Sequence, residues 1–222
     1  DRIYKNVGYA WATQFTSNPP MVEEKNNYTG SYRREFEIPA DWQGSRIFMH
    51  VGSATSNLTV WVNGKEVGYS EDSKMEAVFD LTPYLTPGNK ALIAMQVMRW
   101  CDGTYLEDQD FWRFTGIARE VYLYARPQAH VQDIFAMPDL TNNYRDGSLK
   151  VKVNTEKAKG KNLQLSLVDA EGRQVWRAEA KADETTSFEC SLANPNKWTA
   201  ETPYLYTLYT TLSDGKEVIE VI

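Results

Sequence analysis

The 222-residue sequence is short of positive charge and of long apolar runs, and each shortage excludes a class of partner. Its 24 lysines and arginines are outnumbered by 30 acidic residues, giving a net charge of −6, so no basic surface is available to neutralise phosphates or anionic lipids. The longest mainly apolar stretch, residues 91–98, falls far short of the ~20 residues that span a bilayer. We therefore expect a soluble protein that binds neither nucleic acid nor membranes, and both a cytoplasmic and a periplasmic location stay open.

Cysteine and histidine are equally scarce, with two of each. Cys101 and Cys190 lack metal-type spacing and fall in different halves of the chain, which favours two separate buried thiols over a disulfide. His50 and His130 occur in unrelated settings, which favours structural roles for both. The sequence also lacks a phosphate-binding glycine loop and a nucleophile elbow, so nucleophilic catalysis by these residues is not expected.

What the sequence does contain is period-two alternation in short runs separated by turn residues, which is typical of antiparallel β-sandwiches. Residues 58–62 alternate as a strand does and lead to Asn63-Gly64, a pair suited to a type I′ hairpin turn. Residues 66–69 are then expected to form the second strand of the hairpin. Residues 91–97 are apolar at nearly every position, which predicts a central strand covered on both faces.

A second group of alternating segments begins after Arg126-Pro127, where the proline ends a strand and the aromatic-rich composition of the first part ends. We place a domain boundary there, between residues 1–126 and 127–222. In the second part, residues 149–153 and 163–167 alternate between apolar side chains and polar or smaller ones. This alternation predicts strands with one face exposed to solvent. Hairpin turns are expected at Asp146-Gly147, Glu171-Gly172 and Asp214-Gly215. The spacing of these turns is typical of a seven-strand immunoglobulin-like sandwich.

The two ends of the chain predict a piece of a longer protein. The sequence opens at Asp1 without a methionine, and it stops at Ile222 inside an apolar, alternating strand. We expect more protein downstream.

The most unusual stretch, residues 100–113, holds four acids and four aromatic side chains between two strands. Crowded carboxylates attract a cation, an arginine or hydrogen-bond donors. Aromatic faces beside a few carboxylates are the usual mixture of a small-molecule site, so carbohydrate is a reasonable ligand.

Two other interpretations of this stretch stay open. Asp108 or Asp110 could pair with Arg113 or Arg99 and only cap one end of the sandwich. Glu107 with Asp110 could also form a retaining glycosidase pair, whose carboxyl groups lie ~5 to 5.5 Å apart, although both would sit on one loop with no pocket wall opposite.

Several segments occur in the order found in one known family. They are Asn6-Val7, Asn18-Pro19-Pro20, Val60-Trp61-Val62-Asn63-Gly64, Phe79-Asp80-Leu81, Gly116-Ile117, and Asn194-Pro195 with Trp198, Glu201, Pro203 and Leu205-Tyr206. The most specific element is Asp102-Gly103 with residues 105–110 and Trp112-Arg113. Together these residues resemble family 2 glycoside hydrolases, and the specific element resembles the β-galactosidase branch in preference to β-glucuronidases or β-mannosidases. The resemblance covers essentially the whole chain.

The resemblance implies an all-β fold: a jelly-roll-like, galactose-binding-like β-sandwich over residues 1–126 and an immunoglobulin-like β-sandwich over 127–222. It implies a parent enzyme, a homo-oligomer, that hydrolyses terminal β-D-galactosides with retention through two glutamates on a following barrel. Neither glutamate is in this sequence, so the chain alone would be inactive. It would supply one edge of the active site and pack on the barrel.

The resemblance also assigns site residues and cofactors. Asn6 and Asp110 would contact the galactoside, and Asp110 would bind sodium. Glu71 and Asp102 match positions near a structural divalent ion, magnesium, although the family's usual glutamine is Glu71 here. Two other classes of function remain: a free-standing carbohydrate-binding module, and a ligand-free scaffold or oligomer interface.

Overall fold

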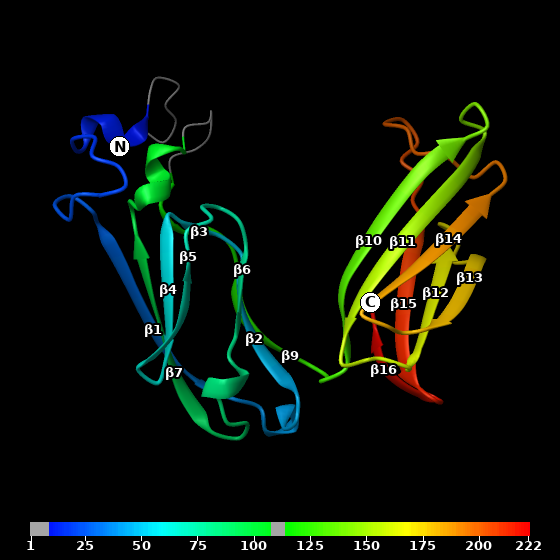
Figure 1. The fold of residues 1–222 in the computed structure, drawn as a ribbon, viewed down its shortest axis with the longest axis horizontal. Coiled ribbons are helices and arrows are strands. Elements are labelled where there is room, and N and C mark those ends of the chain that lie inside the picture. Colours follow the sequence, from blue (N-terminus) through cyan, green and yellow to red (C-terminus); the bar gives the residue numbers. More distant parts are fainter. Residues whose placement is uncertain (1–8, 108–113) are drawn as a thin grey trace. The chain divides into compact units, whose positions relative to one another are not determined.

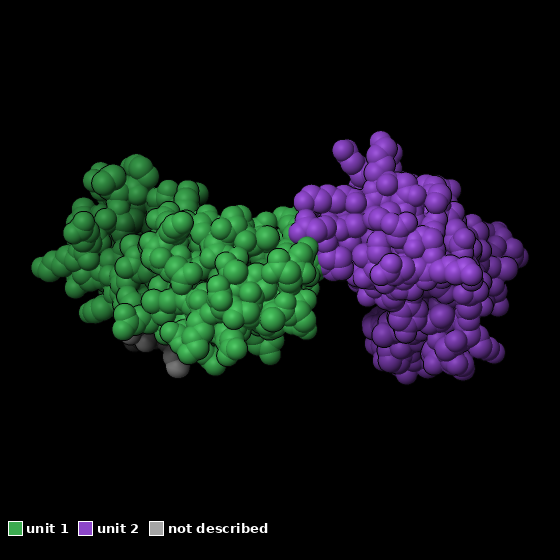
Figure 2. Space-filling view, turned by 90° about the horizontal axis from the view of Figure 1, so that it is seen from below, with its two compact units in different colours: residues 1–126 green, residues 127–222 purple. Residues whose placement is uncertain are grey.

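The computed structural model describes residues 9–107 and 114–222, and the chain divides into two compact units, Asp1–Arg126 and Pro127–Ile222 (Figure 2). Strands dominate both units, which confirms the predicted all-β fold (Figure 1). Within the described residues the helices are four short 3-10 turns: η1 (Ala10–Thr13), η2 (Ala40–Trp42), η3 (Thr82–Tyr84) and η4 (Asp102–Tyr105). None of these described helices is long or apolar enough to cross a membrane.

The first unit is a sandwich of antiparallel sheets. Its strands are β1 (Thr29–Glu37), β2 (Arg46–Val51), β3 (Ala54–Thr55), β4 (Asn57–Val62), β5 (Lys65–Ser70), β6 (Ala77–Asp80), β7 (Lys90–Met98), β8 (Gly116–Ile117) and β9 (Val121–Arg126). A sheet in the order β1-β7-β4-β5 faces a sheet in the order β6-β2-β9, and β3 pairs with β8. One apolar cluster joins alternate side chains of β2, β4 and β7, so the core lies between the two larger sheets.

The hairpin predicted at Asn63-Gly64 is confirmed. Strand β4 ends at Val62 and β5 begins at Lys65, and both turn residues have positive φ, 50° and 80°, as a type I′ turn requires. The Asn63 side chain also accepts a hydrogen bond from the Leu92 amide of β7 at 2.9 Å. The turn is thereby tied to the neighbouring strand.

Strand β7 lies inside its sheet, between β1 and β4, as predicted, but the expectation that both faces are covered is wrong. Ala91, Ile93 and Val97 are buried, whereas Leu92 is 39% exposed. In an antiparallel sandwich one face of each sheet packs on the core and the other meets solvent, so a run of apolar residues does not by itself imply two buried faces.

The second unit is a seven-strand, immunoglobulin-like sandwich. Its strands are β10 (His130–Thr141), β11 (Asp146–Glu156), β12 (Asn162–Val168), β13 (Gln174–Lys181), β14 (Thr185–Leu192), β15 (Thr207–Asp214) and β16 (Glu217–Val221). Sheets in the orders β10-β11-β14 and β13-β12-β15-β16 enclose a separate core. The predicted alternation is confirmed: Val151 and Val153 are buried while Lys150 and Lys152 are exposed.

One predicted turn of this unit is displaced. Asp146-Gly147 lies within β11, paired with the end of β10, and the chain reverses instead through Asn142, Asn143 and Tyr144, which all have positive φ. Asparagine tolerates this conformation, so the two asparagines were the better turn signal. Gly172 and Gly215, at the other two predicted turns, do adopt positive φ in hairpins.

Candidate functional site

The acidic, aromatic stretch begins where β7 ends at Met98 and passes through Trp100 and Cys101 into η4. The Ser56 hydroxyl donates to the Arg99 carbonyl at 3.0 Å, and the Cys101 amide donates to the Thr104 hydroxyl at 3.0 Å. These bonds fix the path of the chain directly after the strand.

The two aromatic residues at the start of this stretch are buried. Trp100 is 7% exposed and Tyr105 8%, and both pack against Phe15, with ring centroids 5.8 and 5.9 Å away in edge-on contacts. Trp11 completes the cluster at 4.9 Å from Tyr105. The suggestion that aromatic faces of this stretch bind sugar is therefore wrong for Trp100 and Tyr105, because neighbouring aromatic rings already cover them.

Tyr105 also anchors the segment that precedes β1. Its hydroxyl donates to the Met21 carbonyl at 2.6 Å and accepts from the Asn18 amide at 3.2 Å. A buried tyrosine usually finds such partners for its hydroxyl. The start of the loop is therefore held both by packing and by hydrogen bonds, which gives the residues that follow Tyr105 a fixed base.

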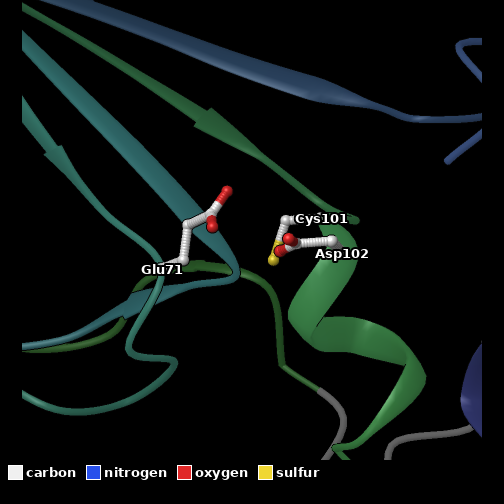
Figure 3. Close-up of side chains that lie close together, drawn as sticks. All are labelled: Glu71, Cys101 and Asp102. Carbon is white, nitrogen blue, oxygen red and sulfur yellow. The ribbon is translucent and has the colours of Figure 1, made fainter. Parts of the chain in front are cut away.

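Beside η4, three side chains that can bind a metal ion come together: Glu71, Cys101 and Asp102 (Figure 3). One donor atom from each, two carboxylate oxygens and the Cys101 sulfur, lies within 4.8 Å of the others. Glu71 follows β5, Cys101 directly precedes η4 and Asp102 begins it, so segments distant in the sequence contribute to one cluster. The structure thus brings together Glu71 and Asp102, which the sequence had paired.

Each of the three side chains is oriented by a hydrogen bond. The Asn57 amide group donates to Glu71 Oε1 at 2.9 Å, and the Gly103 backbone amide donates to Asp102 Oδ1 at 2.6 Å. The Thr104 hydroxyl donates to the Cys101 sulfur at 3.9 Å. Cys101 is buried, Glu71 is half-buried and Asp102 is exposed, so the cluster opens to solvent on the Asp102 side.

The donor set fits magnesium only in part. Two carboxylates suit a hard cation, but Mg²⁺ requires an octahedral shell of oxygens, and a thiol sulfur is a poor member of it. Sequence reasoning treated Cys101 as an inert buried thiol and missed its place in the cluster. Its position directly before Asp102 was the available signal.

Four of the residues that the sequence nominates, Asn6, Asp108, Asp110 and Arg113, lie outside the described residues. Glu107 is described and half-buried, but its suggested partner Asp110 is not.

The structural roles expected for the histidines agree with their surroundings. His130 is fully buried in the second unit, with Nδ1 2.9 Å from the Pro127 carbonyl and Nε2 3.1 Å from Gln132 Oε1. His50 stacks on Tyr122 in the first unit, with ring centroids 4.6 Å apart. The two cysteines are free and buried, as predicted.

Comparison with known families matches both units. The family model described as glycosyl hydrolases family 2, sugar binding domain, matches residues 1–127, and that of glycosyl hydrolases family 2 matches residues 129–222.

Curated relatives match along almost the whole chain. The β-galactosidase of Priestia megaterium is 38% identical over 223 residues, which cover 96% of this chain and 22% of the relative. That of Aeromonas hydrophila subsp. hydrophila is 41% identical over 226 residues, covering 96% and 21%. That of Clostridium acetobutylicum is 37% identical over 223 residues, covering 99% and 24%. The chain thus spans less than a quarter of the length of these relatives.

Solved structures with the same fold include β-glucuronidases. Bacteroides uniformis β-glucuronidase 2 is 25% identical with a TM-score of 0.76, covering 88% of this chain and 26% of that chain. Ruminococcus gnavus β-glucuronidase is 23% identical with a TM-score of 0.75, covering 94% and 36%. At these identities the likeness establishes the arrangement of strands.

Proposed function

The chain belongs to glycosyl hydrolase family 2, and from this premise we propose that it is the non-catalytic N-terminal part of a retaining β-galactosidase. Its substrate in that enzyme is a terminal β-D-galactoside, and the acid/base and nucleophile glutamates belong to a following barrel on which this part packs. The observation that carries the proposal is the 37–41% identity with β-galactosidases across at least 96% of this chain.

The choice of galactose over glucuronic acid depends on those relatives. Their identity to this chain is well above that of the β-glucuronidase structures, which support the fold. The sequence adds Asp102-Gly103 and residues 105–110, the element that resembles the β-galactosidase branch.

Within the enzyme, this part supplies one edge of the sugar pocket. Asn6 and Asp110 contact the galactose hydroxyls, and Asp110 also holds sodium. Binding energy from remote hydroxyls positions the anomeric carbon for attack, which is useful only if the contacting residues are held rigidly. The buried Trp100 and Tyr105 support this role, because they anchor the chain a few residues before Asp110.

The first experiment is calorimetry on the 222-residue chain with galactose and lactose, with and without sodium. Millimolar or undetectable binding is expected, because a partial pocket lacks the walls on the barrel. Micromolar binding would contradict the proposal and favour a free-standing carbohydrate-binding module. Glucuronic acid is the matched control sugar, because the β-glucuronidase structures share this fold.

A second experiment separates an accessory part from a ligand-free scaffold. The corresponding N-terminal region of the Priestia megaterium β-galactosidase is replaced by this chain, and hydrolysis of aryl β-galactosides and aryl β-glucuronides is compared. Galactosidase activity with retention, read from the anomer released, supports the proposal. In a folded chimera, an activity unaffected by substitutions at both Asn6 and Asp110 would favour the scaffold.

A further inference from the structure

We propose that an apolar groove in the second unit receives an extended segment of chain that continues β16 past Ile222 and carries apolar side chains at alternate positions. The inference rests on the proposed function, because it needs a longer enzyme, and deepens it by naming the surface on which the following segment docks. Its test reads a backbone amide in the second unit and involves no sugar. It can therefore fail while the proposed function stands, and the reverse.

The groove lies between the two sheets of the second unit, at the end where β10 turns into β11 (Figure 1), and has a volume of about 510 Å³. Its walls are mostly apolar and come from both sheets and from the loop between β14 and β15. On that loop the side chains of Trp198 and Leu205 are largely exposed. A contiguous apolar surface of this kind usually marks a site that another segment or molecule covers.

Along β10, side chains on the core face of the sheet are left exposed. Ala136 pairs with the buried Val151, and residues directly opposite each other in a ladder lie on the same face of the sheet. Pro138 and Leu140 follow at alternate positions of the same strand, so they share that face. All three line the groove and all three are exposed. The apolar core of the second unit is therefore open to solvent along the groove.

The edge of β15 beside the groove is also unoccupied within the described residues. Thr210 and Ile222 exchange backbone hydrogen bonds: the Thr210 amide donates to the Ile222 carbonyl at 2.7 Å, and the Ile222 amide donates to the Thr210 carbonyl at 2.9 Å. Backbone groups two residues apart point to the same side of a strand, so the Leu208 amide and carbonyl face the same edge as those of Thr210. No described strand pairs with Leu208 on that side. A free edge of this kind is a template for another strand.

The register of β15 and β16 identifies the occupant. A segment that continues β16 past Ile222 pairs next with Tyr209 and then with Leu208, so every second side chain of the segment lies on the face of Leu208. Leu208 and Ala136 are both walls of the groove, and these side chains therefore enter it. About four residues, at ~3.4 Å each, are enough to reach Tyr206.

Strand addition of this kind combines two contributions. Backbone hydrogen bonds to the free edge give affinity, and pockets for alternate side chains give specificity. A segment attached to Ile222 also reaches the groove at an effective concentration on the order of millimolar, which a separate molecule must supply from solution. A continuous chain is therefore the occupant that this geometry favours over a second copy of the unit.

The test extends the 222-residue chain by about eight residues, those that follow the matched region in the Priestia megaterium β-galactosidase. We expect hydrogen exchange at the Leu208 backbone amide, followed by nuclear magnetic resonance, to slow about tenfold or more, because the amide gains a hydrogen-bond partner. Exchange at the Val60 amide in the first unit should not change. The matched control extension carries one serine between Ile222 and the same added residues. This insertion moves every added side chain to the opposite face and should give little protection.

Two adjacent substitutions on β10 provide a second measurement. In the extended chain, Ala136→Asp places a charge in the groove and should abolish the protection of the Leu208 amide. Phe135→Asp is the matched control, because Phe135 is exposed and faces the opposite side of β10, and it should leave the protection in place. Circular dichroism checks that each variant is folded.

The proposal is overturned by equal exchange at the Leu208 amide with and without the extension, by equal protection from the serine-shifted extension, or by full protection in a folded Ala136→Asp variant. Protection of Leu208 that rises with the concentration of the unextended chain would place a second copy in the groove and would also overturn it.

Discussion

Asn27 and Trp100 exchange hydrogen bonds in both directions: the Trp100 amide donates to Asn27 Oδ1 at 2.9 Å, and Asn27 Nδ2 donates to the Trp100 carbonyl at 3.0 Å. One amide side chain thus replaces a neighbouring strand as partner for the backbone of Trp100. The pair joins the start of β1 to the end of β7, at the base of the loop that leads to the candidate site.

Asn27→Ala removes both bonds and leaves two backbone groups of a buried tryptophan without these partners. We expect the free energy of unfolding to fall by about 1 to 3 kcal/mol, measured by urea denaturation. Asn89→Ala, at an exposed asparagine, should change it by less than about 0.5 kcal/mol. Equal effects of the two substitutions would show that the exchange with Trp100 contributes nothing.

Tyr105→Phe keeps the aromatic packing but removes the hydroxyl that bonds Met21 and Asn18. We expect the free energy of unfolding to fall by about 1 to 2 kcal/mol and hydrogen exchange at the Asn18 backbone amide to become faster. Tyr69→Phe, at a 66% exposed position, is the control. Unchanged exchange at Asn18 would mean that the hydroxyl does not anchor that segment.

Asp80 makes stability depend on pH. Burial alone would raise its pKa, but hydrogen bonds from Arg46 and Thr82 outweigh burial and hold the pKa below its usual 3.8. A lowered carboxyl pKa contributes stability that is present above the unfolded-state pKa and is lost as pH falls through the folded-state pKa. The contribution of Asp80 is therefore present at neutral pH and disappears below 3.8.

Asp80→Asn should lower the free energy of unfolding at neutral pH by about 1 kcal/mol or less, since the ion pair with Arg46 is partly exposed. The difference from wild type should shrink as the pH falls, in urea denaturation at a series of pH values. Glu35→Gln, which breaks the exposed pair with Lys90, is the control and should have almost no effect. If the free energies of unfolding of Asp80→Asn and wild type differ by the same amount at every pH, the shape of the Asp80 side chain, and not its charge, contributes the stability.

Asp110→Ala should lower turnover of the β-galactosidase chimera about tenfold or more and weaken its response to sodium, because a positioning contact is lost. Kinetics over a sodium titration provide the measurement. Asp133→Ala, at an exposed aspartate of the second unit, is the control. An Asp110→Ala enzyme with wild-type kinetics at every sodium concentration would refute the assigned role.

The sequence was informative where structure is decided locally. The Asn63-Gly64 turn and the alternation along β4, β11 and β12 depend on adjacent residues, so pattern alone was enough to predict them. The exposed Leu92 and the turn at Asn142-Asn143 were mispredicted, because run length and an Asp-Gly pair are weaker signals than the register of neighbouring strands.

The candidate site depended on contacts that no local pattern encodes. Glu71 and Asp102 could be paired only through family resemblance, and the one local sign that Cys101 joins them was its position directly before Asp102. No local pattern predicted the contacts of Phe15 and Trp11 either. Their rings cover Trp100 and Tyr105, which are far from them in the sequence. Tertiary packing, not propensity, decides which aromatic residues remain available to a ligand.

The distribution of the two histidines gives the molecule a pair of built-in spectroscopic reporters. His50 stands in the first unit against Tyr122, and His130 is enclosed in the second with both ring nitrogens hydrogen-bonded. Imidazole resonances are few and well separated in proton spectra, so each unit carries its own signal without any label. Melting of one unit can therefore be followed independently of the other in a single sample.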